Sequence, residues 1–134
     1  MAETFTVEVV TPTSIRTFNE VGHVRASGVD GQFGVLPRHI PAIIGLKSGA
    51  LRIDTEGGKK ILATSGGYCE VQRDKILFLV ETAELPEEID VERAQNSLDR
   101  ARARLKERGA GLDMNRALSA INRAKNRLKI AGMK

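Results

Sequence analysis

The chain has 134 residues, with 21 Lys and Arg against 17 Asp and Glu, and a formal net charge of +4. This length fits one ordinary domain, or a domain of about 85 residues with a helical appendage, and excludes two full-sized domains. Hydrophobic residues make up 41% of the chain, which predicts a folded core. The absence of Trp, with only four Phe and one Tyr, makes that core aliphatic and leaves few platforms for stacking single-stranded nucleic acid.

The single cysteine, Cys69, excludes an intrachain disulfide and favours a reducing compartment. The N-terminal residues Met1 to Thr4 have neither the basic stretch nor the apolar core of a signal peptide. The chain also has no run of about 18 apolar residues. We therefore expect a soluble protein, which can still be attached to a membrane complex.

Charge and composition divide the chain near residue 88. Residues 1–88 carry 9 Lys and Arg against 12 Asp and Glu, whereas residues 89–134 carry 12 against 5. Ten of the 13 glycines and all four prolines precede the division. We therefore expect two units, residues 1–88 and residues 89–134, that differ in secondary structure and in charge.

The first unit alternates β-branched or apolar residues with polar ones, which is typical of short strands. Turn residues break the pattern at short intervals, and we interpret the glycine-rich stretch from Gly28 to Gly34 as one of these turns. This spacing predicts an antiparallel β-sandwich or barrel. The clearest expected strands cover residues 4–10, 21–27, 50–54, 60–64, 68–72 and 75–82.

The second unit changes to helical spacing, because apolar residues recur at intervals of three and four along two stretches. Gly109-Ala110-Gly111 separates the stretches, and Asp113 is positioned to cap the second helix. We expect an antiparallel two-helix hairpin after the sandwich, which makes the fold α+β. Much of the seam is Ala, which buries little area, so the hairpin should be weakly held. The seam positions are Val91, Ala94, Leu98, Ala101, Leu105, Met114, Ala117, Ile121, Ala124, Leu128 and Ala131.

Motifs for catalysis or metal binding are not recognisable. The glycine-rich stretch lacks the spacing of a dinucleotide fingerprint, and no long helix follows it. His23 and His39 have no Cys, His or acidic residue at a zinc-like spacing, and they form no nucleophile motif with Ser65 or Cys69. We therefore expect a binding or coupling protein that is not an enzyme, with no metal site and no required cofactor.

The strongest chemical signal is the positive charge of the helices, which is either a solvated face or a surface that attracts phosphate or an acidic protein. Arg123 and Arg127, four residues apart, share one helix face, where they either straddle a phosphate or merely aid solubility. Asp90 and Arg93 either pair locally or present an acceptor and a donor to a ligand. A basic module that binds nucleic acid is the alternative function, although it lacks a known motif.

The segment Gly31 to Pro41, which reads GQFGVLPRHIP, resembles the signature of the epsilon subunits of F-type ATP synthases. Similar segments follow in the family's order at residues 49–53, 65–71 and 82–84, so the resemblance covers essentially the whole chain. The sequence departs from the family at Arg38, because glycine is frequent before this histidine.

The resemblance implies a non-catalytic subunit of the central stalk, peripheral on the cytoplasmic side of the cell membrane. Its β-sandwich would bind the gamma subunit and the ring of c subunits. Gln32 would lie in a loop that meets the ring, and His39 would face gamma. The hairpin would fold against the sandwich in a compact state. In an extended state it would reach an acidic region of the catalytic beta subunits and inhibit ATP hydrolysis.

Residues 89–94, which read IDVERA, resemble the motif with which some bacterial epsilon subunits bind ATP in the compact state. The resemblance implies that Arg123 and Arg127 hold the phosphates by charge-assisted hydrogen bonds, whereas Glu84, Asp90 and Arg93 help to fix the rest of the nucleotide. ATP would then be a regulatory ligand, and it would favour the compact state only through its higher affinity for that state.

Overall fold

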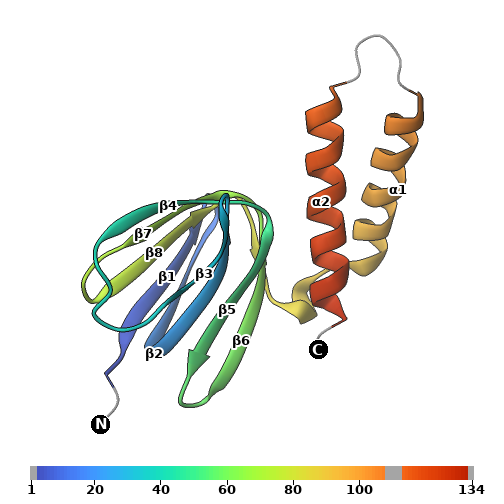
Figure 1. Ribbon diagram of the computed structural model, residues 1–134. Coiled ribbons are helices and arrows are strands. Elements are labelled where there is room, and N and C mark those ends of the chain that lie inside the picture. Colours follow the sequence, from blue (N-terminus) through green and yellow to red (C-terminus); the bar gives the residue numbers. More distant parts are fainter. Residues whose placement is uncertain (1–2, 108–112, 133–134) are drawn as a thin grey trace.

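The computed structural model describes residues 3–107 and 113–132, which form a β-sandwich followed by a helical hairpin (Figure 1). The α+β fold class predicted from the sequence is confirmed. A short 3-10 helix, η1 (Pro86–Glu88), lies between the two parts. The strands are β1 (Phe5–Thr11), β2 (Ser14–Gly28), β3 (Gly31–Val35), β4 (Ala42–Leu46), β5 (Gly49–Thr55), β6 (Gly58–Thr64), β7 (Gly67–Val71), β8 (Lys75–Val80) and β9 (Ala83–Glu84), and the helices are α1 (Val91–Glu107) and α2 (Met114–Ala131).

The described strands pair in the order β1-β8-β7-β4-β2-β5-β6-β9, and β3 pairs with β2. The 15 residues of β2 join the two layers, because its first part lies beside β1 and its second part lies beside β3 and β5. The register of β2 shifts near Val21, and Glu20 has a φ of 55°, which marks a bulge where the strand changes layer. The described pairings are antiparallel except that of β1 with β8, which is parallel.

The sandwich core is aliphatic, as the composition predicts. Burying one Val, Leu or Ile side chain contributes about 1.5–3 kcal/mol, so the sandwich has the apolar contacts to hold its own shape. Cys69 lies in this core, and its burial raises the pKa of the thiol to about 12. The most deeply buried side chains are Val7, Val9, Val21, Val24, Val35, Leu51, Ile53, Leu62, Val71, Ile76 and Phe78.

The glycine-rich stretch is a β-hairpin, so the prediction of a turn from residue 28 to residue 34 is wrong for its second half. Gly28 pairs with Gly31, and only Val29 and Asp30 form the loop between β2 and β3. Gly31 has a φ of 128°, which a residue with a side chain rarely adopts. β3 was not expected because its glycines interrupt the alternation of apolar and polar side chains by which a strand is identified. β4 and the first part of β2 were also not among the expected strands.

The two helices pack through Leu98 and Ala101 of α1 and through Ile121 and Ala124 of α2, as the seam predicts. Asp113 caps α2, because its carboxylate accepts a hydrogen bond of 3.0 Å from the Arg116 backbone N–H. The predicted loop Gly109-Ala110-Gly111 lies outside the described residues. Neither described helix has both the length and the apolar character needed to cross a bilayer.

The seam is shorter than the sequence predicts. Val91 is 48% exposed and Met114 is 46% exposed, so the expectation that both lie in the seam is wrong. Each is the first residue of its helix. Because helical side chains lean toward the N-terminus, a side chain at the first position projects past the end of the helix.

Candidate functional site at the junction of sandwich and hairpin

The hairpin meets the sandwich through the C-terminal part of α2, and α1 lies on the far side of α2 (Figure 1). Ile130 is fully buried there, and Ala131 is 7% exposed, in a cluster with Ala63 and Ile89. The expectation that Ala131 belongs to the seam between the helices is therefore wrong, because it packs toward the sandwich. This apolar contact is small compared with the sandwich core. Polar contacts therefore have a large share in setting the position of the hairpin.

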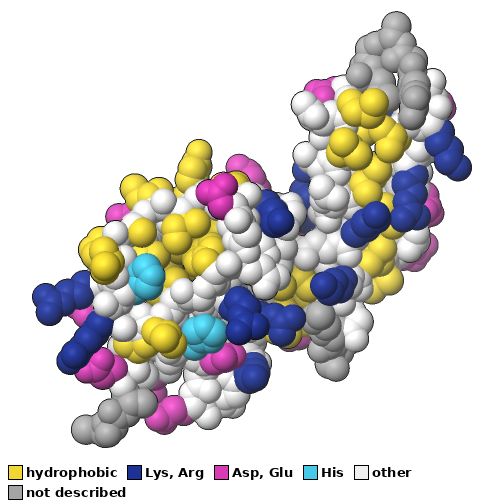
Figure 2. Space-filling view, viewed as in Figure 1, with side chains coloured by type: hydrophobic (Ala, Val, Ile, Leu, Met, Phe, Trp, Pro, Cys, Tyr) yellow, Lys and Arg dark blue, Asp and Glu magenta, His cyan; other side chains and the backbone are white. Residues whose placement is uncertain are grey.

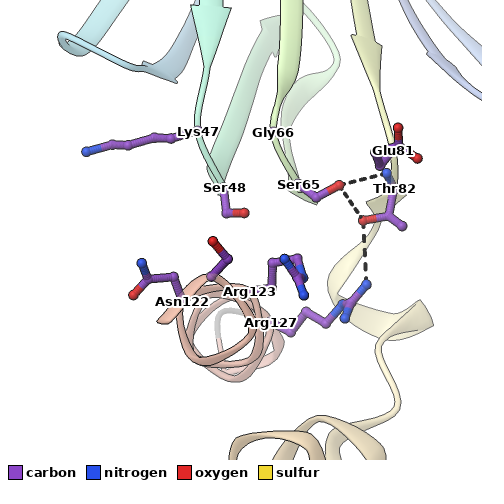
Figure 3. A pocket seen from close by; sticks show the side chains of 10 residues that line it. Lys47, Ser48, Ser65, Gly66, Glu81, Thr82, Asn122, Arg123 and Arg127 are labelled. Carbon is purple, nitrogen blue, oxygen red and sulfur yellow. Dashed lines mark hydrogen bonds between the residues drawn. The ribbon is translucent and has the colours of Figure 1, made fainter. Parts of the chain in front are cut away.

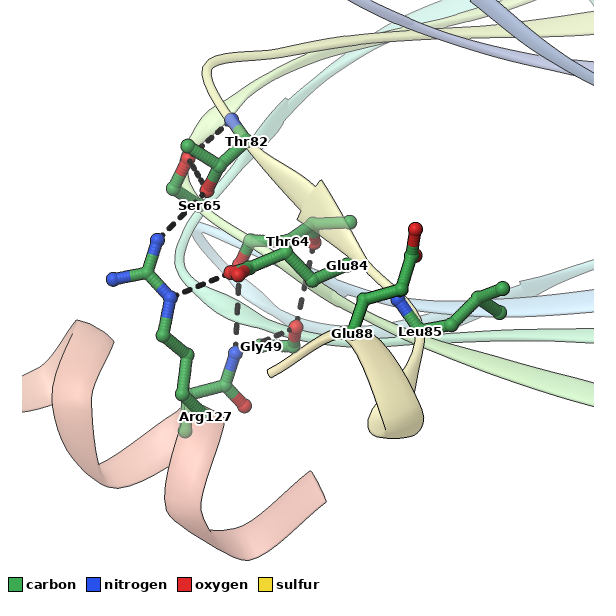
Figure 4. Close-up of polar contacts among 9 residues, drawn as sticks. Gly49, Thr64, Ser65, Thr82, Glu84, Leu85, Glu88 and Arg127 are labelled. Atoms are coloured by element: carbon green, nitrogen blue, oxygen red, sulfur yellow. Dashed lines mark hydrogen bonds and ion pairs between the residues drawn. The ribbon is translucent and has the colours of Figure 1, made fainter. Parts of the chain in front are cut away.

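Asn126 and Arg127 make these polar contacts. The Asn126 amide donates to the Gly49 carbonyl at 2.9 Å and to the Thr64 carbonyl at 3.5 Å. Arg127 Nε donates to Glu84 at 2.6 Å (Figure 4), and both side chains of this ion pair are about 30% exposed. We call Asn126 and Arg127 the latch, because they join α2 to strands β5, β6 and β9.

Ser65 and Thr82 extend the latch on the sandwich side. Ser65 Oγ accepts hydrogen bonds from the Thr82 backbone N–H at 2.9 Å and from the Thr82 hydroxyl at 3.0 Å. The Thr82 hydroxyl lies 3.5 Å from Arg127 Nη2, which completes the chain of contacts drawn in Figure 4. The Ser65 hydroxyl therefore serves to position Thr82 and Arg127.

In the part of the chain that the structure describes, two large cavities adjoin Arg123 and Arg127. The first, of about 800 Å³, lies between α2 and the ends of strands in the sandwich, and both arginines point from α2 toward Ser65 and Thr82 (Figure 3). The second, of about 700 Å³, lies along the two helices and is lined by five arginines; we call it the arginine groove. The acidic residue among its described lining is Asp113, the cap of α2. The five arginines are Arg100, Arg104, Arg116, Arg123 and Arg127.

The structure brings together three of the five residues expected to bind ATP. Arg123 and Arg127 line both cavities, and Glu84 is paired with Arg127. Asp90 is instead the N-cap of α1, because its carboxylate accepts a hydrogen bond of 3.0 Å from the Arg93 backbone N–H. Neither Asp90 nor Arg93 is among the described residues that line the two cavities. Of the two interpretations of this pair, the structure shows the local contact.

The residues expected to contact other subunits lie on the sandwich. Gln32 is exposed on β3, paired with Ser27, at the edge of a separate cavity beside α2, so the expectation that it lies in a loop is wrong. His39 lies between β3 and β4, with its Nδ1 atom 2.7 Å from the Ile40 carbonyl oxygen. Among the described residues, no three His, Cys, Asp or Glu side chains gather as metal ligands would.

Other residues of the site were not singled out from the sequence. Arg100 and Arg104 have the same spacing of four as Arg123 and Arg127, so the same signal could have found them. Asn126 and Ile130 are also four residues apart, outside the seam, and together they mark the second face of α2 that contacts the sandwich. A search for two faces on this helix would have found the latch.

An apolar patch lies on the outer face of β4, β7 and β8. Ile43 is 77% exposed, and the direct cross-strand partners Tyr68 and Leu79 are 63% and 43% exposed. Figure 2 shows apolar side chains on the sandwich at a distance from the helices. Exposed patches of this kind often mark surfaces that bind other proteins.

The fold and the site define a protein of two parts, a β-sandwich and a helical hairpin that is docked on it through a small junction. One chain of the Euglena gracilis mitochondrial ATP synthase, solved with OSCP, F1 and c-ring, has this fold with a TM-score of 0.82 and 23% identity, over 100% of this chain and 83% of that chain. A chain of the Tetrahymena thermophila mitochondrial ATP synthase central stalk and c-ring is similar with a TM-score of 0.58 and 13% identity, over 98% and 96% of the two chains. These low identities show the fold alone.

Sequence comparison shows the family. The beta-sandwich domain of the ATP synthase delta/epsilon chain matches residues 4–86, and the long alpha-helix domain of the same chain matches residues 87–132. The ATP synthase epsilon chain of Brevibacillus brevis is 47% identical over 108 residues, 80% of this chain and 82% of that one. The epsilon chain of Carboxydothermus hydrogenoformans is 48% identical over 108 residues, 81% of each chain. The chain belongs to the family of ATP synthase epsilon chains, which confirms the resemblance seen in the sequence.

Proposed function

We propose that the chain is a non-catalytic subunit of the central stalk of an F-type ATP synthase, peripheral on the cytoplasmic side of the membrane. It couples rotation to ATP synthesis, and its hairpin regulates ATP hydrolysis. The observation that carries this proposal is the small junction between the two parts, which consists of the latch, Ile130 and Ala131. Because each part keeps its own apolar cluster, the hairpin can leave the sandwich without unfolding either part.

The sandwich is proposed to bind the gamma subunit and the ring of c subunits. The apolar patch of Ile43, Tyr68 and Leu79 supports a permanent protein partner, because these side chains are exposed when the chain is alone. His39 is assigned to the gamma-facing surface and Gln32 to the surface that meets the ring. One structural relative is itself described as part of a central stalk and c-ring.

The hairpin is proposed to inhibit ATP hydrolysis when it extends toward an acidic region of the catalytic beta subunits. The 12 Lys and Arg of residues 89–134, against 5 Asp and Glu, give the helices the charge for such a partner. The small side chains of the seam support a hairpin that can also change its own packing. Opposite charges would raise the rate of association more than the final affinity.

ATP is proposed to bind along α2 and to stabilise the compact state. Arg123 and Arg127 would hold the phosphates. Glu84 would orient Arg127, since it engages Nε, and the terminal amino groups would still have N–H groups to donate beside the long contact of Nη2 with Thr82. Asp90 would act by fixing the start of α1, and Arg93 remains a candidate contact to the nucleotide. Because Glu84 and Arg127 meet when the hairpin is docked, ATP would bind this state more tightly and increase its population.

The first test measures ATP hydrolysis by the catalytic complex that lacks its own epsilon subunit. Full-length protein is expected to inhibit, whereas residues 1–88 are expected to bind without inhibiting. The truncated chain keeps the sandwich core, which draws on residues up to Leu85. If neither protein binds, the assignment to the stalk fails; if both inhibit equally, the hairpin is not the regulator.

The second test measures ATP binding to the isolated chain by calorimetry. Arg123→Gln is expected to weaken binding about tenfold or more, which is the effect of losing a hydrogen bond to a charged group. Lys125→Gln is the matched control, because it removes the same charge two residues away on an exposed face of the same helix. Similar losses in both variants would point to general charge attraction and would contradict a defined ATP site.

A further inference from the structure

A third cavity, of about 330 Å³, lies where the sandwich meets the end of α2, and neither Arg123 nor Arg127 lines it. We call it the junction cavity. Strands β2, β3 and β5 form one wall, and α2 forms the other. Its charged lining consists of Arg25, Arg52 and Lys129, and no Asp or Glu is among the described residues that line it. Neutral polar groups come from Ser27, Gln32, Ser48 and Asn126.

Arg25 and Arg52 are directly opposite each other on neighbouring strands, and both are exposed on the outer face. Like charges in this arrangement destabilise a sheet. The ion pairs formed within residues 3–107 and 113–132 engage neither arginine, nor do they engage Lys129. The sheet therefore carries a repulsion that an anion bound between the two guanidinium groups would remove.

The surrounding surface adds further positive charge. A hollow of about 110 Å³ adjoins the cavity, since Arg25 and Arg52 line both, and Lys59 lies there too. Asp54 is the carboxylate among the described residues that line this hollow, and it is 3.5 Å from the His23 ring. Figure 2 shows Lys and Arg side chains gathered where the sandwich meets the helices. The excess of cations on this face is thus only partly offset.

We propose that the junction cavity binds a phosphate-bearing anion, held by Arg25, Arg52 and Lys129. Its volume falls in the range of about 300–1,000 Å³ that is common for small-molecule sites. Guanidinium groups donate two hydrogen bonds at once to phosphate oxygens, and the serine hydroxyls and the Gln32 amide offer neutral donors around them. The exposure of the cations makes the binding sensitive to salt.

The site is complete only when the hairpin is docked. The two arginines come from the sandwich, whereas Lys129 comes from α2, three residues after Asn126 of the latch. An anion that contacts all three cations has a higher affinity for the docked arrangement, so it increases the population of that arrangement. This site is separate from the arginine groove, and it does not depend on ATP binding there.

The test uses inorganic pyrophosphate as the probe and the full chain carrying Arg123→Gln, which weakens the arginine groove. NMR follows the guanidinium signals of Arg25 and Arg52 and the backbone amide of Lys129. We expect saturable shifts of all three signals. Lys129→Gln is expected to weaken binding about tenfold, through loss of one charge-assisted hydrogen bond. Lys125→Gln, one turn earlier on the same helix, is expected to change it less than about twofold.

A second variant separates binding from folding. Arg52→Gln should also weaken pyrophosphate binding, yet it removes the repulsion with Arg25, so unfolding in urea should show a chain at least as stable as its parent.

Vesicles of phosphatidylglycerol, with phosphatidylcholine as the neutral control, distinguish a lipid headgroup from a free anion. Binding to phosphatidylglycerol that is lost with Lys129→Gln and kept with Lys125→Gln supports the same site with a headgroup as ligand. Equal losses in both lysine variants, or no saturable binding of either probe, would overturn the proposal.

Discussion

Arg38 stands at a position where the backbone favours glycine. Its φ is 64°, which costs a residue with a side chain about 1–2 kcal/mol. The side chain is 80% exposed and pairs with Glu3, and such exposed pairs contribute about 0–1 kcal/mol. We expect Arg38→Gly to be more stable than Arg38→Ala by about 0.5–1 kcal/mol, because glycine relieves the strain and only part of the gain is offset by its greater freedom in the unfolded chain. Urea unfolding measures the difference. Both variants lack the guanidinium, so the loss of the ion pair with Glu3 affects them equally and does not contribute to the difference. Equal stability of the two variants would show that the backbone strain is absent.

Glu88 links the segment between the two parts to β2. A hydrogen bond from Arg16 and a second from the Leu85 backbone N–H lower the pKa of this carboxyl below its ordinary value of 4.5. A lowered pKa in the folded state stabilises the protein above the unfolded pKa, and this contribution is lost as the pH falls through the folded pKa. We therefore expect the stability difference between the wild-type chain and Glu88→Gln to shrink as the pH falls below about 4.5. Urea unfolding at several pH values tests this, with the exposed neighbour Glu87→Gln as the control. A difference that does not change with pH would rule out the link.

Single side chains were predictable where their role is local. Asp113 was expected to cap α2 and does so, because a cap depends on the residues that follow it directly. The geometry of Arg38 was left open by its departure from the family pattern, and the structure shows a positive φ there. The partners of Asn126 were beyond sequence reasoning, since Gly49 and Thr64 are 77 and 62 residues away along the chain.

The two helices depend on a seam in which small and large apolar side chains alternate. Ile121 is 7% exposed within that seam, whereas Leu118, on the same helix, is 43% exposed. We expect Ile121→Ala to destabilise the hairpin by about 2 kcal/mol, near the lower end for a buried Ile, and Leu118→Ala to cost well under 1 kcal/mol. Amide hydrogen exchange should show faster exchange in α1 and α2 and unchanged exchange in the sandwich. Equally faster exchange in both parts would mean that they unfold as one unit.

The elements themselves were predictable to different degrees. Helix periodicity located α1 and α2 because each presents one continuous apolar face to the other. The strands with regular alternation were also found, but β3 contains two glycines and β4 reads as a short apolar run, so neither showed a clear period of two. The parallel pairing of β1 with β8 arises from how the sandwich closes, and no local pattern encodes it.

The arrangement of the two parts depends on few contacts, which makes the whole molecule sensitive to the latch. Asn126→Ala with Arg127→Gln removes a hydrogen bond to a charged group, worth about 1.5–3 kcal/mol, and at least one neutral bond worth about 1 kcal/mol. The ion pair is about one-third exposed, so the lower values apply. Burial of Ile130 remains and contributes about 1.5–3 kcal/mol to docking. These terms are similar in size, so we expect the double variant to populate docked and undocked arrangements together.

Spin labels at Arg73→Cys and Arg102→Cys, both exposed positions, would report the separation of the sandwich from α1. Cys69 should stay unlabelled, because it is buried and the pKa of its thiol is raised to about 12. We expect one narrow distance distribution for the labelled parent and a broad one for the double variant, with the circular dichroism spectrum unchanged. Lys125→Gln in the labelled parent is the control for charge loss on α2. A narrow distribution in the double variant would show that Ile130 and Ala131 alone fix the position of the hairpin. In that case a ligand or a neighbouring subunit could not control the undocking of the hairpin by acting on the latch.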